Sequence, residues 1–406
     1  MVASPAILTG VHGGPDALGV PAHDFSTNSN ACGPCPAVLS ALQQADATRY
    51  PDPAYTALRA ALAAQHGVAP GRIVVAGSAS EFIHRITTWA RLQGLAQVLL
   101  PPHSYGDYAQ AAQAHGLAVR RRGAGDLDGA HGAHGASTTL QWACEPASPL
   151  GTVDAALAAW HAAPAAGAGG GGSLRVVDCA YRPLVLEPAH AFSAASTSLP
   201  ASAWQLWSPN KALGLTGVRA AYAVAPAGAE GMVPALQGLA SSWPVGAHGV
   251  ALLHAWATPA VQQWVEGCVP TLREWKARQL ALCTALGWAV VPGSLANYFV
   301  ATLASPSVST AETVFGDDLP APNPSVRAEP VEARVRSGTT DLCGPGVAHP
   351  VTSALLAALR QHGIKLRDCA SFGLPGALRL GVLSPASQDA LQAAWHAMQA
   401  DPTLRA

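Results

Sequence analysis

The sequence lacks the features of several large classes of protein. Only 12% of its residues are charged and the formal net charge is -1, so no basic surface for nucleic acid is expected. The start of the chain has no basic region followed by an apolar run. No later segment approaches the roughly 18 apolar residues of a membrane span. We therefore predict a cytoplasmic protein that binds neither nucleic acid nor a membrane.

Cysteine is also scarce, with eight residues in 406, too few for a fold built on disulfides. Cys32 and Cys35 have the C-x-x-C spacing of thioredoxin-type redox sites, which need a preceding strand and a helix N-terminus. A turn-rich stretch over 24–30 precedes them instead. We therefore favour a Gly/Pro loop that enters a helix over 37–44, with a redox site as the alternative. The histidines are scattered without Cys or acidic partners, and we expect no metal site.

Length and composition predict a two-domain enzyme. Half of the residues are hydrophobic, in helix- and strand-length runs, and 406 residues exceed the roughly 250–300 at which a single core stops growing. We predict an N-terminal segment over 1–45 that joins a small domain, a large domain over 46–250, and the rest of the small domain over 251–406. Residues 305–347, rich in Pro, Ser, Glu and Arg without a period, predict a disordered insertion.

Helical patterns and short apolar runs alternate from residue 50 onward. The residues Ser78-Ala79-Ser80-Glu81 form a capping box that opens a helix over 82–92. The expected strands of this region cover 73–76, 97–100, 118–121, 138–143, 174–178, 204–207 and 220–224. This alternation predicts an α/β domain with a mostly parallel sheet. Two more strands are expected in the small domain, near 298–302 and 378–382.

Polar side chains follow two strands of the predicted sheet. Asp178 ends the strand over 174–178, and Tyr181 comes three residues later. Lys211 follows the strand over 204–207, and Arg219 lies eight residues further on. Because ligands of doubly wound sheets bind beyond the carboxyl ends of strands, we expect these side chains to meet in one site. A lone lysine after a strand is usually a solvated surface residue, and these neighbours favour a functional one.

With these motifs the sequence resembles the fold-type I pyridoxal-phosphate (PLP) enzymes, specifically the group of histidinol-phosphate aminotransferases and threonine-phosphate decarboxylases. The resemblance runs from His12 to Arg379. It implies an aspartate aminotransferase-like PLP-transferase fold, with a large, mostly parallel α/β/α domain and a smaller α/β domain. It also implies pyridoxal 5'-phosphate as the cofactor, a homodimer, and Lys211 of the S-x-x-K segment as the residue that holds the cofactor as a Schiff base.

The resemblance assigns further cofactor contacts around Lys211. Ser208 and Arg219 would bind the phosphate, Asp178 would keep the ring nitrogen protonated, and Tyr181 would lie near the ring oxygen. These residue types suit the chemistry, because PLP is an electron sink only while its ring nitrogen carries a proton, which a buried carboxylate favours. An arginine suits the phosphate because it binds such groups through two parallel hydrogen bonds.

Other cofactor contacts follow from the same resemblance. The backbone N–H groups of Ala79 and Ser80 would bind the phosphate at a helix N-terminus, where unpaired amides and the helix dipole favour anions. Tyr105 would stack on the ring, and Tyr50 would reach the phosphate of the neighbouring subunit. Ser148 stands where the family has an asparagine that donates to the ring oxygen.

The predicted substrate contacts lie near both ends of the chain. Arg367 and Arg379 resemble the substrate-binding arginines of the family, and an apolar strand would bury Arg379 at a cost that an anionic ligand offsets. His12 and Asn28 would complete the pocket. The segments around these residues resemble the threonine-phosphate decarboxylases, which supply the aminopropanol arm of cobalamin. We therefore predict a phosphorylated amino acid or amine as the substrate, with L-threonine O-3-phosphate favoured.

Two alternatives stay open at this point. The first is an aminotransferase of the histidinol-phosphate type, because two arginines could orient a substrate for either reaction. The second is a non-catalytic PLP-fold binding protein, supported by three departures from the family pattern. These are Ser148, Cys179 in place of an acidic residue, and Asn210 in place of a hydroxyl residue before Lys211. Ser148 could still donate one hydrogen bond, with a shorter reach that would change the ring electronics, and neither of the other two changes removes a group that the cofactor chemistry requires.

Overall fold

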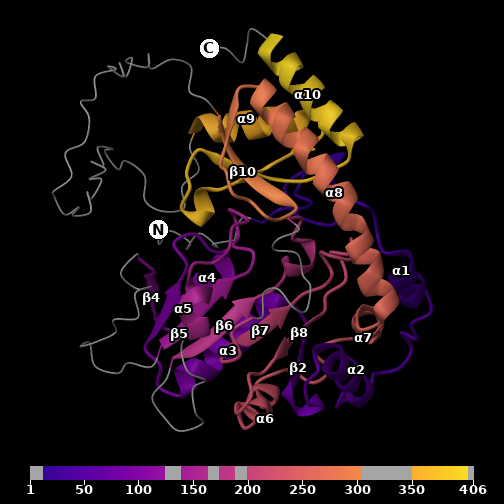
Figure 1. The fold of residues 1–406 in the computed structure, drawn as a ribbon, viewed down its shortest axis with the longest axis vertical. Coiled ribbons are helices and arrows are strands. Elements are labelled where there is room, and N and C mark those ends of the chain that lie inside the picture. The colour runs from indigo at the N-terminus through magenta and orange to yellow at the C-terminus, as the bar shows by residue number, and fades with distance from the viewer. Residues whose placement is uncertain (1–11, 124–138, 163–172, 188–198, 304–349, 401–406) are drawn as a thin grey trace, which may run out of the picture.

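A computed structural model describes residues 12–123, 139–162, 173–187, 199–303 and 350–400 of the chain (Figure 1). The predicted insertion over 305–347 lies outside these described residues. Within them, none of the helices combines the length and the apolar character needed to cross a membrane.

A seven-stranded sheet forms the large part of the molecule, in the order β2-β8-β7-β6-β5-β3-β4. Its strands are β2 (Ile73–Ala76), β3 (Gln97–Leu100), β4 (Ala118–Arg121), β5 (Thr139–Cys144), β6 (Leu174–Asp178), β7 (Trp204–Trp207) and β8 (Ala221–Val224). The pairs from β4 to β7 are parallel, whereas β8 runs antiparallel to both of its neighbours. All seven predicted strands form, within one residue at either end, and the predicted mostly parallel sheet is confirmed.

Helices cover both faces of this sheet because successive side chains of a strand point to opposite sides. In β2, Ile73 and Val75 belong to one buried cluster, and Val74 and Ala76 belong to the other. The first cluster contains side chains of α1 (Pro36–Gln43), α2 (Thr56–His66), α5 (Ala156–Ala162), α7 (Ala247–Trp256) and α8 (Pro259–Ala285). The second contains side chains of α3 (Ala79–Leu92), α4 (Gly106–Ala114) and α6 (Met232–Gly238). The large part is therefore an α/β/α sandwich.

A four-stranded antiparallel sheet forms the small part, in the order β12-β13-β10-β9. Its strands are β9 (Trp288–Val290), β10 (Tyr298–Leu303), β12 (Arg367–Asp368) and β13 (Ala377–Gly381), packed with α9 (Pro350–Gln361) and α10 (Pro385–Ala400). The sequence did not predict β9 and β12, because strands of two or three residues are too short to show a period. Figure 1 shows the long helix α8 running along one side of the molecule from the large sheet to the small one.

The segment that precedes α1 crosses from one part to the other. Its strand β1 (His23–Asp24) pairs in parallel with β11 (Ile364–Lys365). The Gly381 amide donates to the Phe25 carbonyl at 2.7 Å, and the Asn30 amide donates to the Lys211 carbonyl at 2.9 Å. This segment is therefore attached both to the small sheet and to the loop that follows β7.

The cysteine pair of the sequence forms part of this crossing. Cys35 is buried in the core at the start of α1, and the Cys32 thiol lies 3.9 Å from the carbonyl oxygen of Cys268 on α8. The seven cysteines of the described residues are all free. The structure therefore agrees with a loop that enters a helix.

Candidate active site

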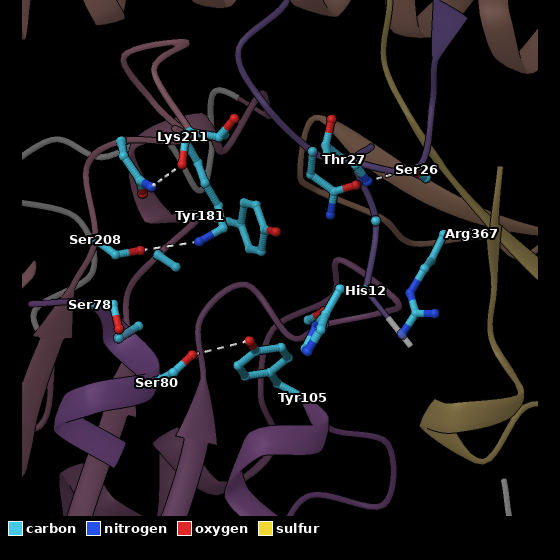
Figure 2. A pocket seen from close by; sticks show the side chains of 18 of the residues that line it. His12, Ser26, Thr27, Ser78, Ser80, Tyr105, Tyr181, Ser208, Lys211 and Arg367 are labelled. Atoms are coloured by element: carbon cyan, nitrogen blue, oxygen red, sulfur yellow. Dashed lines mark hydrogen bonds between the residues drawn. The ribbon is translucent and has the colours of Figure 1, made fainter. Parts of the chain in front are cut away.

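A cavity of about 580 Å³ opens where the ends of β5, β6 and β7 meet the small sheet. This volume is within the range of about 300–1,000 Å³ that small-molecule sites occupy. Among the predicted site residues only Tyr50 is absent from its wall. The others all line it: His12, Asn28, Ala79, Ser80, Tyr105, Ser148, Asp178, Tyr181, Ser208, Lys211, Arg219, Arg367 and Arg379. Figure 2 shows Lys211, Tyr181 and Ser208 on one side of the cavity and His12 and Arg367 on the other.

Asp178 lies at the end of β6 and is almost completely buried. Its Oδ1 atom accepts from the Ala180 amide at 2.9 Å, and its Oδ2 atom accepts from the Tyr108 hydroxyl at 2.8 Å. Burial raises the pKa of this carboxyl, while the bond from Tyr108 and the charge of Lys211 oppose the rise. These two hydrogen bonds fix the orientation of the Asp178 carboxylate. A fixed carboxylate suits the role of pairing with a cationic ring nitrogen.

Lys211 lies in the turn that follows β7. Its Nζ atom donates to Ser208 Oγ at 3.2 Å and lies 5.4 Å from the centre of the Tyr181 ring (Figure 2). The turn is held by the bond from the Asn30 amide described above and by the Asn30 side chain, which donates to the Ala212 carbonyl at 3.0 Å. The amine therefore extends into the cavity from a backbone that is fixed on two sides.

A set of anion-binding groups surrounds the N-terminus of α3. Ser78 caps the helix and accepts from the Glu81 amide at 3.0 Å, as the predicted capping box requires. The Glu81 carboxylate does not return to the Ser78 amide but accepts from the Gly77 amide at 3.1 Å. The first amides of a helix have no partner within it, so those of Ala79 and Ser80 are available to a ligand in the cavity.

The loop that carries Arg219 also lines the cavity. Asn210 donates from its side chain to the carbonyls of Thr216 and Val218, both at 3.4 Å, and so ties the loop to the turn of Lys211. Asn210 therefore has a clear role although it departs from the family pattern. Cys179 is fully buried in the core and does not line the cavity, so this second departure does not touch the site.

Tyr105 is the N-cap residue that directly precedes α4, and it presents its ring to the cavity. Its hydroxyl lies 3.4 Å from Ser80 Oγ, and its ring centre lies 6.1 Å from that of His12 (Figure 2). Burial raises the pKa of this hydroxyl, which is therefore neutral at physiological pH. The position of Tyr105 beside the N-terminus of α3 is consistent with the predicted stacking of its ring on one face of a ligand.

Two arginines dominate the side of the cavity formed by the small sheet. Arg367 and Arg379 are register partners on β12 and β13, and each is only 6% exposed. The Phe372 ring centre lies 5.0 Å from the Arg367 guanidinium and 5.4 Å from that of Arg379. Within the described residues, neither guanidinium forms an ion pair with a carboxylate. Burial, together with the charge of Arg379, lowers the pKa of Arg367 to about 10.

Several buried polar atoms of the cavity residues have no hydrogen-bond partner in the described part of the chain. They are both side-chain polar atoms of Asn28, Asn210 Oδ1, Arg367 Nη1 and Arg379 Nε. Buried polar groups are satisfied in the great majority of cases, and those that are not call for a ligand or water. The donors among them suit a ligand that carries anionic oxygens.

Ser148 contributes differently from the predicted ring-oxygen donor. Its Oγ atom accepts from Arg379 Nη1 at 3.3 Å, while Arg379 Nη2 donates to the Ser26 carbonyl at 3.1 Å. The serine therefore fixes a substrate-side arginine and still has its own hydroxyl proton to donate.

The sequence missed several residues that line the cavity. They are Asp24, Ser26, Tyr108, Thr216 and Phe372. Tyr108 lies one helical turn after Tyr105, which was a possible signal, but nothing in the spacing indicated that its partner is Asp178. Asp24 and Ser26 hydrogen-bond each other at 2.5 Å within the segment of Asn28.

Tyr50 lies outside the cavity. It is 77% exposed and stacks on Trp243, with ring centres 4.3 Å apart. Within one chain it therefore contacts none of the groups described above. The predicted contact of Tyr50 with a phosphate requires a second subunit.

The chain matches the family described as aminotransferase class I and II over residues 21–397. It therefore belongs to this family, the PLP-dependent enzymes of fold type I that the sequence resembles. Among curated proteins, the histidinol-phosphate aminotransferase of Ruegeria pomeroyi is 28% identical over 299 residues, which cover 72% of this chain and 79% of that protein. Other histidinol-phosphate aminotransferases match over shorter stretches, such as 26% and 40% of their own length.

Solved structures share the fold over nearly the whole chain. The histidinol-phosphate aminotransferase of Sinorhizobium meliloti, in complex with pyridoxal-5'-phosphate, has a TM-score of 0.68 at 19% identity and covers 98% of this chain and 100% of its own. The L-threonine-O-3-phosphate decarboxylase of Porphyromonas gingivalis has a TM-score of 0.65 at 18% identity and covers 93% and 99%. The predicted PLP-transferase fold is thus confirmed. At these identities the likeness establishes the fold, and the reaction has to be argued from the site.

Proposed function

We propose that the protein is a PLP-dependent decarboxylase that acts on L-threonine O-3-phosphate. The observation that carries this proposal is the pair of buried guanidinium groups of Arg367 and Arg379, neither of which forms an ion pair with a carboxylate of the described residues. Two buried cations side by side are costly without anions. A substrate with both a carboxylate and a phosphate supplies these anions, and His12 and Asn28 line the same cavity.

The residues of the large sheet would hold the cofactor. Lys211 would bind it covalently, Asp178 would face its ring nitrogen, and Tyr105 would cover its ring. The phosphate would lie among the Ala79 and Ser80 amides, Ser208 and Arg219, all of which line the cavity. When bound, PLP supplies an electron sink for the electrons left on the substrate Cα after a bond to that carbon breaks.

The residues of the small sheet would select the bond that breaks. A bond to Cα is weakened when it stands perpendicular to the cofactor ring, so a decarboxylase must hold the substrate carboxylate out of the ring plane. Arg367 lies on the side of the cavity opposite to Lys211 (Figure 2), and Arg379 is its register partner on the neighbouring strand, which suits that task. After carbon dioxide leaves, Cα requires a proton, and the Lys211 amine is the group of the cavity suited to deliver it.

An aminotransferase of the histidinol-phosphate type is the second candidate. The names of the curated relatives favour it. Histidinol phosphate has a phosphate but no carboxylate, so it would leave the arginine pair less completely balanced. An aminotransferase of this type would use the second arginine to bind the dicarboxylic acid that accepts the amino group.

Incubation of the purified enzyme with L-threonine O-3-phosphate is expected to release carbon dioxide and aminopropanol phosphate, because the arginine pair matches both anions of this substrate. Mass spectrometry of the products measures this directly. A parallel incubation with histidinol phosphate and 2-oxoglutarate serves as the matched reaction. Formation of glutamate in the second mixture, with no aminopropanol phosphate in the first, would reverse the ranking.

We further propose that the active form is a homodimer in which Tyr50 reaches the cofactor phosphate of the neighbouring subunit. The support is its exposure and its absence from the wall of the cavity in its own chain. We also propose the division into the segment 1–45, the large domain 46–250 and the small domain 251–406, supported by the pairing of β1 with β11.

Mixing two weakened variants tests the shared site. Tyr50→Ala and Lys211→Ala are each expected to lose most activity as pure proteins, because each lacks one group of every site. Mixed dimers contain one site with both groups intact, so unfolding and refolding the two proteins together should restore part of the activity. Turnover before and after mixing is the measurement, with light scattering for the mass. A monomer, or a mixture as inactive as its components, would contradict the proposal.

A further inference from the structure

Tyr108 is a cavity residue to which the cofactor contacts described so far give no task. It lies on α4 with no exposed surface, and its ring stacks on Trp142 of β5, with ring centres 4.4 Å apart and an angle of 12° between the planes. Its hydroxyl is directed away from this stack to Asp178 Oδ2, at 2.8 Å. The packing thus aims one buried hydroxyl at the carboxylate that would face the cofactor ring.

The surroundings of Asp178 show what this hydroxyl does. Each carboxylate oxygen has one fixed donor, the Ala180 amide on Oδ1 and the Tyr108 hydroxyl on Oδ2, so rotation of the carboxylate would break both bonds. Within the described residues, the bond from Tyr108 and the charge of Lys211 oppose the rise in the Asp178 pKa that burial causes.

The remaining titratable groups around Asp178 act in the opposite direction or are neutral. Asp107 of α4 raises the pKa of Asp178 through its charge. Burial raises the pKa values of Cys144, its register partner on β5, and of Cys179, the next residue, so both thiols are uncharged. Burial and the Asp178 charge also raise the pKa of Tyr108, so its hydroxyl keeps its proton and remains a donor.

We propose that Tyr108 is a positioning residue that holds the Asp178 carboxylate ionised and in a fixed orientation toward the cofactor ring. If Tyr108 only filled the core, its stack on Trp142 would be sufficient, and a phenylalanine would provide that stack equally well. The inference rests on the assignment of Asp178 to the cofactor ring. It does not depend on the choice between decarboxylation and amino transfer.

The test is the affinity of the cofactor-free protein for PLP, titrated over a range of pH. Asp178 must be ionised to pair with a protonated ring nitrogen, so binding is complete above its pKa and is lost as the pH falls through it. Tyr108→Phe removes a bond that lowers this pKa. We therefore expect the acid limb of the binding profile to move up by about one pH unit, with binding about tenfold weaker on that limb.

Two matched variants separate the hydroxyl from the packing. Tyr222→Phe makes the same change at another fully buried tyrosine, whose hydroxyl bonds to Trp256 and His66 outside the cavity, and it should leave the acid limb in place. Trp142→Phe disturbs the stack but keeps the Tyr108 hydroxyl, and it should lower thermal stability while moving the limb by less than Tyr108→Phe does. An unmoved limb in Tyr108→Phe, or an equal shift in either control, would overturn the proposal.

A double-mutant cycle distinguishes a failure of this inference from a failure of the Asp178 assignment on which it rests. In an Asp178→Asn background the carboxylate is gone, so adding Tyr108→Phe should weaken PLP binding by less than about twofold. A loss as large as in the wild-type background would mean that Tyr108 acts on packing alone. If Asp178→Asn by itself leaves PLP affinity unchanged, the assignment of Asp178 is wrong and Tyr108 has no such role.

Discussion

Replacing Lys211 with alanine is expected to lower turnover by on the order of 10⁴-fold or more, a loss of the size seen when a covalent catalyst is removed. The amine would both attach the cofactor and carry the proton to Cα, and each other lysine lies elsewhere. Lys276 donates to Ser294 and Lys365 donates to Gly14, and neither lines the cavity. Steady-state turnover with L-threonine O-3-phosphate measures the loss.

Chemical trapping identifies the lysine independently of turnover. The chain contains only three lysines, so borohydride reduction of the PLP-loaded protein followed by peptide mapping has only three possible labelled lysines. The label should be on Lys211 in the wild type and also in Lys365→Met, the matched control. A label on Lys276 or Lys365 would contradict the assignment. A labelled Lys211 in a protein without turnover on any amino acid would support the non-catalytic alternative.

Arg379→Met is expected to lower kcat/KM by about a hundredfold or more, since truncating one partner of a buried charge pair costs roughly 3 kcal/mol. The substrate anion would lose its contact with Arg379 Nε, which has no partner in the described part of the chain. The same change should leave the cofactor-free protein at least as stable, because it removes one of two adjacent buried cations. Kinetics and thermal unfolding of the same variant measure both effects.

Arg278→Met is the control for the expected combination of a lower kcat/KM with undiminished stability in Arg379→Met. Arg278 forms an ion pair with Asp389 at 2.5 Å on a partly exposed surface, and it does not line the cavity. Its replacement should leave kcat/KM unchanged and alter stability by less than about 1 kcal/mol. If Arg379→Met instead lost stability and activity together, Arg379 would be a structural residue, and the argument from unbalanced charge would fail.

The sequence predicted the part of the site that depends on strand ends. Asp178 and Lys211 each follow a strand with a clear apolar pattern, and the carboxyl ends of parallel strands meet at one edge of a sheet. Tyr108 escaped prediction because its partner Asp178 is distant in the chain, and only the fold brings the Tyr108 side chain against Trp142 of β5 and Asp178 of β6. The adjacency of Arg367 and Arg379 depends on β12, which has two residues and shows no pattern.

The crossing segment also sets an order of events during synthesis. Residues 23–30 leave the ribosome before the seven-stranded sheet, but β11 and β13, to which they attach, are made after it. Domains usually form from the N-terminus as the chain emerges. Here the seven-stranded sheet can assemble while His12 and Asn28 still lack their final place. The pocket is complete only when residues 364–381 have been made, so a nascent chain released before residue 381 carries Lys211 and Asp178 without a completed substrate side.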